Sequence, residues 1–151
     1  CFDYYSQLQI NELEKKFPMV TFKNLETYSL KKRFDLGIIS DVLHHIGVED
    51  KNVMIETINN LTKKTNLILI KDHFEYSYMS RQILRFMDFI GNYKDSVDIP
   101  KRYFNVNHFE ELINESQLTE IDRVLNIKIY NKFMFPFNKS KYQFIKLFRK
   151  K

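Results

Sequence analysis

Two short apolar runs, separated by an amphipathic segment, constrain the fold of this chain more than any other feature. The first run is Phe34–Ser40 (FDLGIIS) and the second spans residues 67–70 (LILI). Such runs are typical of strands that are buried on both faces of a sheet. Between them, Asp50 can cap a helix whose apolar positions recur at helical spacing, at Met54, Ile58 and Leu61. Strand, helix and strand in this order predict a parallel βαβ unit, and therefore an α/β fold.

The remaining segments extend this pattern into a mixed sheet. Helices are predicted after Ser6, from Ser80 and from Asn107, where Glu110 completes a capping box. Two strand-like runs follow, at residues 123–130 and 142–148, and a loop between them is compatible with a closing hairpin. We therefore expect a single domain over residues 1–151, with a mostly parallel sheet and an antiparallel C-terminal hairpin.

Glycine and cysteine usage excludes several classes of site. The chain has 3 glycines, too few for a glycine-rich nucleotide loop, and 1 cysteine. A single cysteine excludes an internal disulfide framework and a multi-cysteine zinc site, and it is typical of a reducing, cytoplasmic compartment. No run approaches the roughly 18 apolar residues of a membrane span, and charges interrupt the first twenty residues. We expect neither a membrane span nor a signal peptide.

The formal net charge of +5 is concentrated partly at the C-terminal end. A basic end interleaved with aromatic residues can bind nucleic acid. A solvated chain end explains the same charges, and we favour that interpretation. The basic residues concerned are Lys139, Lys141, Lys146, Arg149, Lys150 and Lys151, and the aromatic ones are Tyr142, Phe144 and Phe148.

Three polar clusters follow predicted strands at the point where each strand ends. They are Asp3, the segment 41–45 (DVLHH) and the segment 71–73 (KDH). The carboxyl ends of parallel strands meet at one edge of an open α/β sheet, and ligands bind at that edge. The alternative is that the aspartates cap the following segments and that the histidines are structural.

The spacing of the adjacent histidines His44 and His45 argues against a metal site. Neighbouring positions on a helix point about 100° apart, and no cysteine or acidic ligand stands at the usual spacing. We therefore predict no metal. A histidine at this position can instead line a pocket or act as a general base, because its ordinary pKa is near neutral.

Segment 34–46 (FDLGIISDVLHHI) resembles the pattern F-D-x-V-x-x-x-D-V-L-H-H of class I S-adenosylmethionine-dependent methyltransferases. Segment 67–73 resembles the fifth strand and its end in a subgroup of these enzymes, of type 11/12. Segment 87–92 (MDFIGN), followed by Pro100 and Tyr103, resembles the substrate-side insertion of that subgroup. Three elements in the right order make the resemblance fairly specific.

The resemblance implies a Rossmann-like sheet and an S-adenosylmethionine site. Asp3 matches the acidic residue that holds the cofactor's ribose, and Asn24 and Leu25 fall where the chain borders the adenine. The methionine portion and the methyl group are implied beside Asp41, Val42 and Leu43. His45, then His44, then His73 are the implied candidates for a catalytic base.

The family's first strand and its glycine-rich loop should precede residue 1, so the first βα unit is missing from this sequence. We therefore expect the C-terminal part of a longer enzyme that methylates a small-molecule acceptor. A degenerate binding module without activity and a fragment of an RNA methyltransferase are the alternatives. A missing strand would leave a sheet edge open, which predicts self-association.

Overall fold

The computed structural model describes residues 2–3, 7–21, 23–24, 33–47, 49–92, 98–125, 127 and 142–151. The chain divides into two compact units, Cys1–Arg33 and Phe34–Lys151. Whether the two units form one domain, as the sequence predicts, stays a prediction.

The described residues of the first unit form one helix and a pair of short strands. Helix α1 (Gln7–Lys16) lies where a helix is expected after Ser6, and it ends before Pro18, which cannot continue a helix. Strands β1 (Phe2–Asp3) and β2 (Lys23–Asn24) are parallel, with Asp3 and Asn24 as register partners. The last residues of the two strands therefore lie opposite each other.

The second unit is built on a four-stranded sheet in the order β3-β4-β6-β5. Strands β3 (Phe34–Ser40) and β4 (Thr65–His73) are parallel, which confirms the predicted βαβ unit. Strand β6 (Gln143–Lys150) is antiparallel to both of its neighbours, β4 and β5 (Leu118–Leu125). The mixed sheet with an antiparallel C-terminal pair is confirmed.

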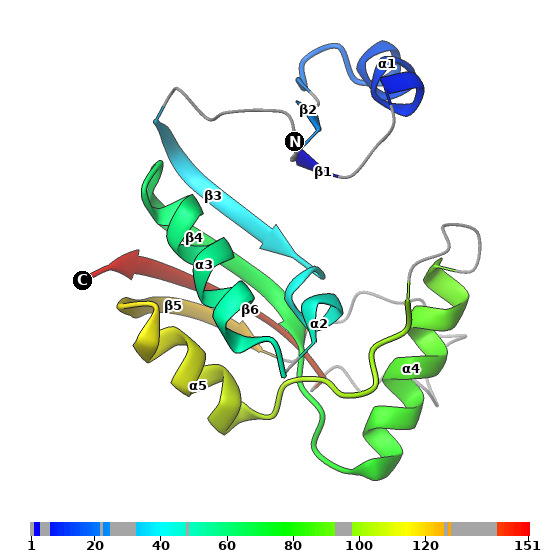
Figure 1. The fold of residues 1–151 in the computed structure, drawn as a ribbon, viewed down its shortest axis with the longest axis vertical. Coiled ribbons are helices and arrows are strands. Elements are labelled where there is room, and N and C mark those ends of the chain that lie inside the picture. The colour runs from blue at the N-terminus through cyan, green and yellow to red at the C-terminus, as the bar shows by residue number, and fades with distance from the viewer. Residues whose placement is uncertain are drawn as a thin grey trace. The chain divides into compact units, whose positions relative to one another are not determined.

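Four helices accompany this sheet. Helices α3 (Lys51–Thr62) and α5 (Val106–Glu115) pack side by side on one face, and α2 (Leu43–Ile46) and α4 (Tyr78–Asn92) lie at the end where β3 and β4 finish (Figure 1). The cap of α5 is Asn105, whose side chain accepts a hydrogen bond from the backbone N–H of His108. The capping box predicted at Asn107 is therefore wrong by two residues.

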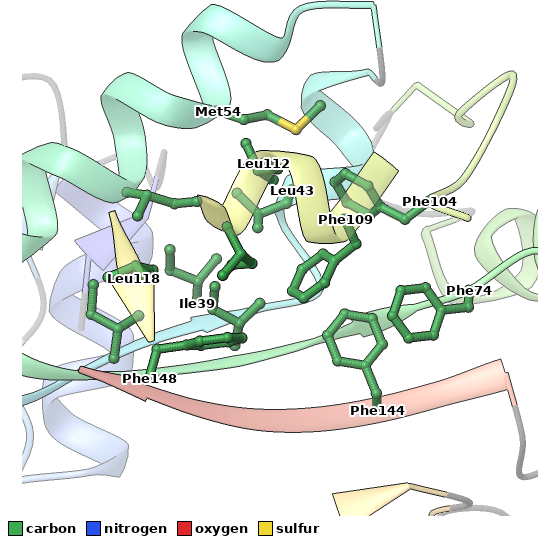
Figure 2. Close-up of a cluster of buried hydrophobic side chains, with 14 residues drawn as sticks. Ile39, Leu43, Met54, Phe74, Phe104, Phe109, Leu112, Leu118, Phe144 and Phe148 are labelled. Atoms are coloured by element: carbon green, nitrogen blue, oxygen red, sulfur yellow. The ribbon is translucent and has the colours of Figure 1, made fainter. Parts of the chain in front are cut away.

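The core lies between the sheet and helices α3 and α5, and phenylalanine rings pack together within it among aliphatic side chains (Figure 2). Phe109 of α5 packs edge-to-face on Phe104 and Phe144, and Phe144 stacks on Phe74 at 4.1 Å between ring centroids. Gly37 of β3 lies so close to α3 that an added Cβ would meet the Leu61 side chain at 2.7 Å. A residue without a side chain is needed there for α3 to approach the sheet.

The described part of the C-terminal basic segment does not form an exposed basic and aromatic surface. Lys146 is buried, and its ammonium donates a hydrogen bond to Glu120 at 2.8 Å. Phe144 and Phe148 belong to the core, and Tyr142 is also buried. Their burial makes all three aromatic residues unavailable to a base, and Phe144 and Phe148 are turned inward by their alternation along β6.

Strand β3 pairs with β4 alone among the described residues, so it forms one edge of the four-stranded sheet. Self-association through such an edge stays a prediction. Within the described ranges, no helix is both long enough and apolar enough to cross a membrane.

Candidate functional site

The carboxyl ends of β3 and β4 bring together the two polar clusters that follow these strands. The backbone N–H of Asp41 donates to the carbonyl of Lys71 at 2.9 Å, which extends the parallel pairing by one residue. Asp41 has φ 54°, a left-handed conformation that is uncommon outside glycine. This conformation ends β3 and leads the chain into α2, which carries both adjacent histidines.

A buried imidazole–carboxylate pair lies at the centre of the site. Nδ1 of His44 donates to Oδ1 of Asp72 at 2.6 Å, and both side chains are inaccessible to solvent, at 1% and 0% exposed. Burial alone would lower the pKa of His44, but the Asp72 carboxylate more than offsets that effect, so this pKa is raised. Burial likewise acts to raise the pKa of Asp72, but His44 and His73 lower it. The pair therefore favours a proton on the imidazole.

His73 lies between two aspartates at the end of β4. Its Nδ1 is 3.6 Å from Oδ1 of Asp41 and 3.7 Å from Oδ1 of Asp72, and its backbone N–H donates to Asp72 at 2.7 Å. The other carboxylate oxygen of Asp41 accepts hydrogen bonds from Lys71 and Ser40. The predicted candidates His44, His73 and Asp41 thus belong to one connected cluster.

His45 differs from His44 in its surroundings. Its Nδ1 donates to the backbone carbonyl of Asp98 at 3.2 Å, and this bond places the proton on Nδ1. Burial and the neighbouring His44 lower the pKa of His45. The imidazole is therefore kept neutral, with the lone pair on Nε2.

Two residues that were not predicted as site residues complete the cluster. Oδ2 of Asp88, on α4, lies 3.6 Å from Nε2 of His44 and accepts a hydrogen bond from the Tyr103 hydroxyl. Burial and the Asp88 carboxylate raise the pKa of Tyr103, so this phenol remains protonated. Both residues lie in segments quoted for the resemblance, but nothing in the sequence shows that they meet His44.

An ion pair fixes the start of α4 to the end of β4. The guanidinium of Arg81 donates two hydrogen bonds of 2.8 Å to Glu75, which also accepts from the backbone N–H of Tyr103 at 3.0 Å. One carboxylate thereby connects α4, β4 and the segment that carries Tyr103. This connection helps to hold Asp88 and Tyr103 against the histidines.

Several buried polar atoms of the cluster have no hydrogen-bond partner among the described residues. They are Oδ1 of Asp41, Nε2 of His44, Oδ2 of Asp72 and Nδ1 of His73. Most buried polar groups in folded proteins are paired, because an unpaired one is costly. Four such atoms in one cluster make it the candidate site for a ligand with hydrogen-bonding groups.

The predicted cofactor residues differ in their location and in their exposure to solvent. Asp3 and Asn24 lie opposite each other in the first unit, and Leu25 is outside the described residues. Val42 is about half exposed, whereas Leu43 is fully buried in the core. A contact of Leu43 with a cofactor would therefore have to use its backbone. The meeting of Asp3 with the other two clusters stays a prediction.

Comparisons with known proteins identify the fold. No protein-family model matches the sequence, and no curated protein does. An S-adenosylmethionine-dependent methyltransferase from Clostridium acetobutylicum gives a TM-score of 0.64 at 16% identity, over 99% of this chain and 73% of that one. A magnesium protoporphyrin IX methyltransferase from Synechocystis, with bound SAH, gives 0.60 at 14% identity, over 99% and 63%.

A third structure is an O-methyltransferase family 2 protein from Planctomyces limnophilus in complex with apigenin, with a TM-score of 0.61 at 15% identity. The match covers 99% of this chain but 42% of that one, so this chain spans only part of the length of the structures it matches. The strand order, the antiparallel C-terminal pair and these matches agree. This chain has the Rossmann-like fold of the class I S-adenosylmethionine-dependent methyltransferases.

Proposed function

We propose that this chain takes part in S-adenosylmethionine-dependent methyl transfer to a hydroxyl group of a small-molecule acceptor. The observation that carries the proposal is the cluster of imidazoles and carboxylates at the carboxyl ends of β3 and β4, where open α/β sheets bind ligands. The methyltransferase fold supports the reaction class. The apigenin complex of one matched O-methyltransferase supports a small hydroxyl acceptor.

The cofactor, when bound, supplies a methyl group on a sulfonium. The assignment of its ribose to Asp3 and of its adenine to Asn24 and Leu25 stays a prediction from the resemblance. Within the second unit, we assign its methionine portion to Asp41, Val42 and the backbone of Leu43. The unpartnered Oδ1 of Asp41 fits this assignment, because a carboxylate oxygen can accept a hydrogen bond from an amine.

His45 is the group that takes the proton. The Nδ1–H of His45 is directed to the Asp98 carbonyl, so Nε2 carries the lone pair that a base requires. In this role Nε2 would accept the proton of the acceptor hydroxyl, and the cofactor, when bound, would supply the methyl group to the acceptor oxygen. His44 and His73 are more deeply buried than His45, and they position the groups around it.

A binding module without catalytic activity is the second candidate. The observation that favours it is the scarcity of glycine, since the 3 glycines provide no phosphate-type or cofactor-type loop. In this case the chain would bind S-adenosylmethionine weakly and transfer no methyl group. An RNA methyltransferase fragment is less well supported, because Phe144 and Phe148 lie in the core.

The test is transfer of a radiolabelled methyl group from S-adenosylmethionine to a panel of small phenols and alcohols. We expect transfer by the wild-type chain, and a loss of about 10²–10⁴-fold in His45→Gln, because an amide cannot act as a base. His108→Gln is the matched control, since His108 is exposed on α5, outside the cluster.

Two outcomes would contradict the proposal. Equal turnover in His45→Gln and in the wild type would remove the base assigned here. No transfer to any acceptor, with cofactor binding retained, would favour the binding module.

A further inference from the structure

We propose that His44, His45 and Asp88 form a binding site for a divalent transition-metal ion. One ligand atom from each of these three residues lies within 4.8 Å of the other two. Two histidines and one carboxylate are the ligand set of many sites that hold such an ion and leave coordination positions open. The proposal goes beyond methyl transfer, because binding of the ion does not require the reaction.

The distances suit a metal site that needs only small movements. Nε2 of His44 and Oδ2 of Asp88 are 3.6 Å apart, close to the roughly 3.4 Å between two ligands of a tetrahedral ion at about 2.1 Å. The rings of His44 and His45 have centroids 4.2 Å apart. The expectation that adjacent histidines diverge is therefore not met at this short helix, where both rings lie close together.

Each of the three ligands is already fixed by a second hydrogen bond. Nδ1 of His44 donates to Asp72, Nδ1 of His45 donates to the carbonyl of Asp98, and Asp88 accepts from Tyr103. Metal-binding histidines almost always donate their other ring N–H to a carboxylate or a backbone carbonyl. Both histidines show this arrangement, which leaves Nε2 of each directed away from its partner.

The charge of the cluster favours a cation. Among the described residues, the only ion-pair partners of Asp72 and Asp88 are histidines. Asp72 is fully buried and Asp88 is 15% exposed, so these carboxylates need a compensating cation, either a proton on Nε2 of His44 or a metal ion in its place. Nε2 of His44 is buried without a partner, so it is available to an ion.

A second set, His44, Asp72 and His73, also has its ligand atoms within 4.8 Å. Its geometry is less suitable. Oδ1 of Asp72 already accepts two hydrogen bonds, at 2.6 and 2.7 Å, and the shorter distance is too small for two ligands of one ion. Asp72 is better suited to orienting His44 than to binding the metal.

Binding of the metal ion and the use of His45 as a base exclude each other. A metal bound to Nε2 of His45 occupies the lone pair that would take the acceptor's proton. The metal-loaded chain therefore cannot use His45 as a base, and a bound transition-metal ion inhibits this step. Imidazole ligands favour zinc, iron, cobalt and nickel over magnesium and calcium, which prefer oxygen.

The test is titration of the full chain with Co²⁺, read by its visible absorption, and with Zn²⁺, read by calorimetry. Neither titration contains cofactor or acceptor, so a negative result leaves the methyl-transfer proposal standing, and failure of methyl transfer leaves this one standing. We expect one ion per chain, with Mg²⁺ and Ca²⁺ giving no competition.

Variants assign the ligands. His45→Gln and Asp88→Asn should each weaken Co²⁺ binding by at least about tenfold, and Asp72→Asn by about 10–100-fold through His44. His108→Gln should bind as the wild type does. Paramagnetic shifts of the His44 and His45 ring protons in the Co²⁺-loaded wild type give the same assignment if a variant does not fold.

Three results would overturn the proposal. One is no binding of Co²⁺ or Zn²⁺ by the folded wild-type chain. Another is unchanged binding in both His45→Gln and Asp88→Asn. The last is a loss in His108→Gln equal to that in His45→Gln, which would show binding to surface histidines.

Discussion

The aromatic core and the histidine–carboxylate cluster both lie in the second unit. They differ in whether their side-chain atoms have partners. The core contains rings in contact, such as Phe74 on Phe144 (Figure 2). The cluster pairs His44 with Asp72 and yet leaves four buried polar atoms without partners. The core is arranged for stability. The unpaired atoms of the cluster do not stabilise the fold, and this difference makes the cluster, and not the core, the candidate site for a ligand.

Removing an aromatic ring from the core should have the largest effect. We expect Phe109→Ala to lower the free energy of unfolding by about 3–5 kcal/mol, because the ring is buried among other rings and leaves a cavity. Chemical denaturation measures this change. Val53→Ala, on the exposed side of α3, should change it by no more than about 0.5 kcal/mol. Equal effects of the two substitutions would contradict this description of the core.

The hydrogen bond between His44 and Asp72 should also contribute to the free energy of unfolding, but less than a core ring does. Asp72→Ala leaves the Nδ1–H of His44 buried without an acceptor, so we expect a loss of about 1–3 kcal/mol. Denaturant titration near neutral pH measures it. A variant as stable as the wild type would show that this pair is not formed in solution.

The close approach of α3 to the sheet can be tested at Gly37. A Cβ there would overlap the Leu61 side chain, which can move only in part. We expect Gly37→Ala to cost about 1 kcal/mol in unfolding free energy. The double substitution Gly37→Ala with Leu61→Val should recover part of this loss, and a larger loss in the double variant would argue against the contact.

The ion pair of Glu75 predicts how stability depends on pH. Burial would raise the pKa of Glu75, but the hydrogen bonds from Arg81 and from the Tyr103 N–H lower it overall. A lowered pKa in the folded state gives stability that is present above the usual pKa of a glutamate and is lost as the pH falls through the lowered value. Denaturation at a series of acidic pH values should show this loss in the wild type and a smaller one in Arg81→Gln.

Asp88, a more exposed part of the cluster than Asp72, should show the smallest effect on stability. Asp88→Asn keeps an acceptor for Tyr103 and removes a charge, so we expect a change within about 0.5 kcal/mol. Thermal unfolding measures it. A loss as large as that of Asp72→Ala would mean that Asp88 is structural, and would remove the contrast between the two parts of the cluster.

The sequence predicts the strands well where burial determines them. Residues 34–40 form β3 as predicted, and 67–70 lie within β4. The expectation that both faces of β3 are buried is wrong, because Leu36 and Ile38 are exposed on one face of this edge strand and only Gly37 and Ile39 are buried. The cap of α5 is less predictable, since Asn105 and Asn107 are chemically equal and only the structure decides between them. Lys146 belongs to a run of basic residues in the sequence, and its pairing with Glu120 depends on the register of β5 and β6.

Part of the candidate site is also predictable from the predicted strands. Asp41, His44 and His73 follow two neighbouring strands, so their meeting follows from parallel pairing. Asp88 and Tyr103 reach the histidines from α4 and the segment after it, and no periodicity predicts such contacts between distant segments. The hydrogen bond from His45 to the Asp98 carbonyl involves a backbone atom and leaves no signal in the sequence.

Calorimetric titration of S-adenosylmethionine into the 151-residue chain tests most directly whether this cluster belongs to a cofactor site. We expect micromolar binding to the wild type, weakened in Asp41→Ala. A folded chain that gives no heat of binding, or that binds equally well in Asp41→Ala, would contradict this expectation.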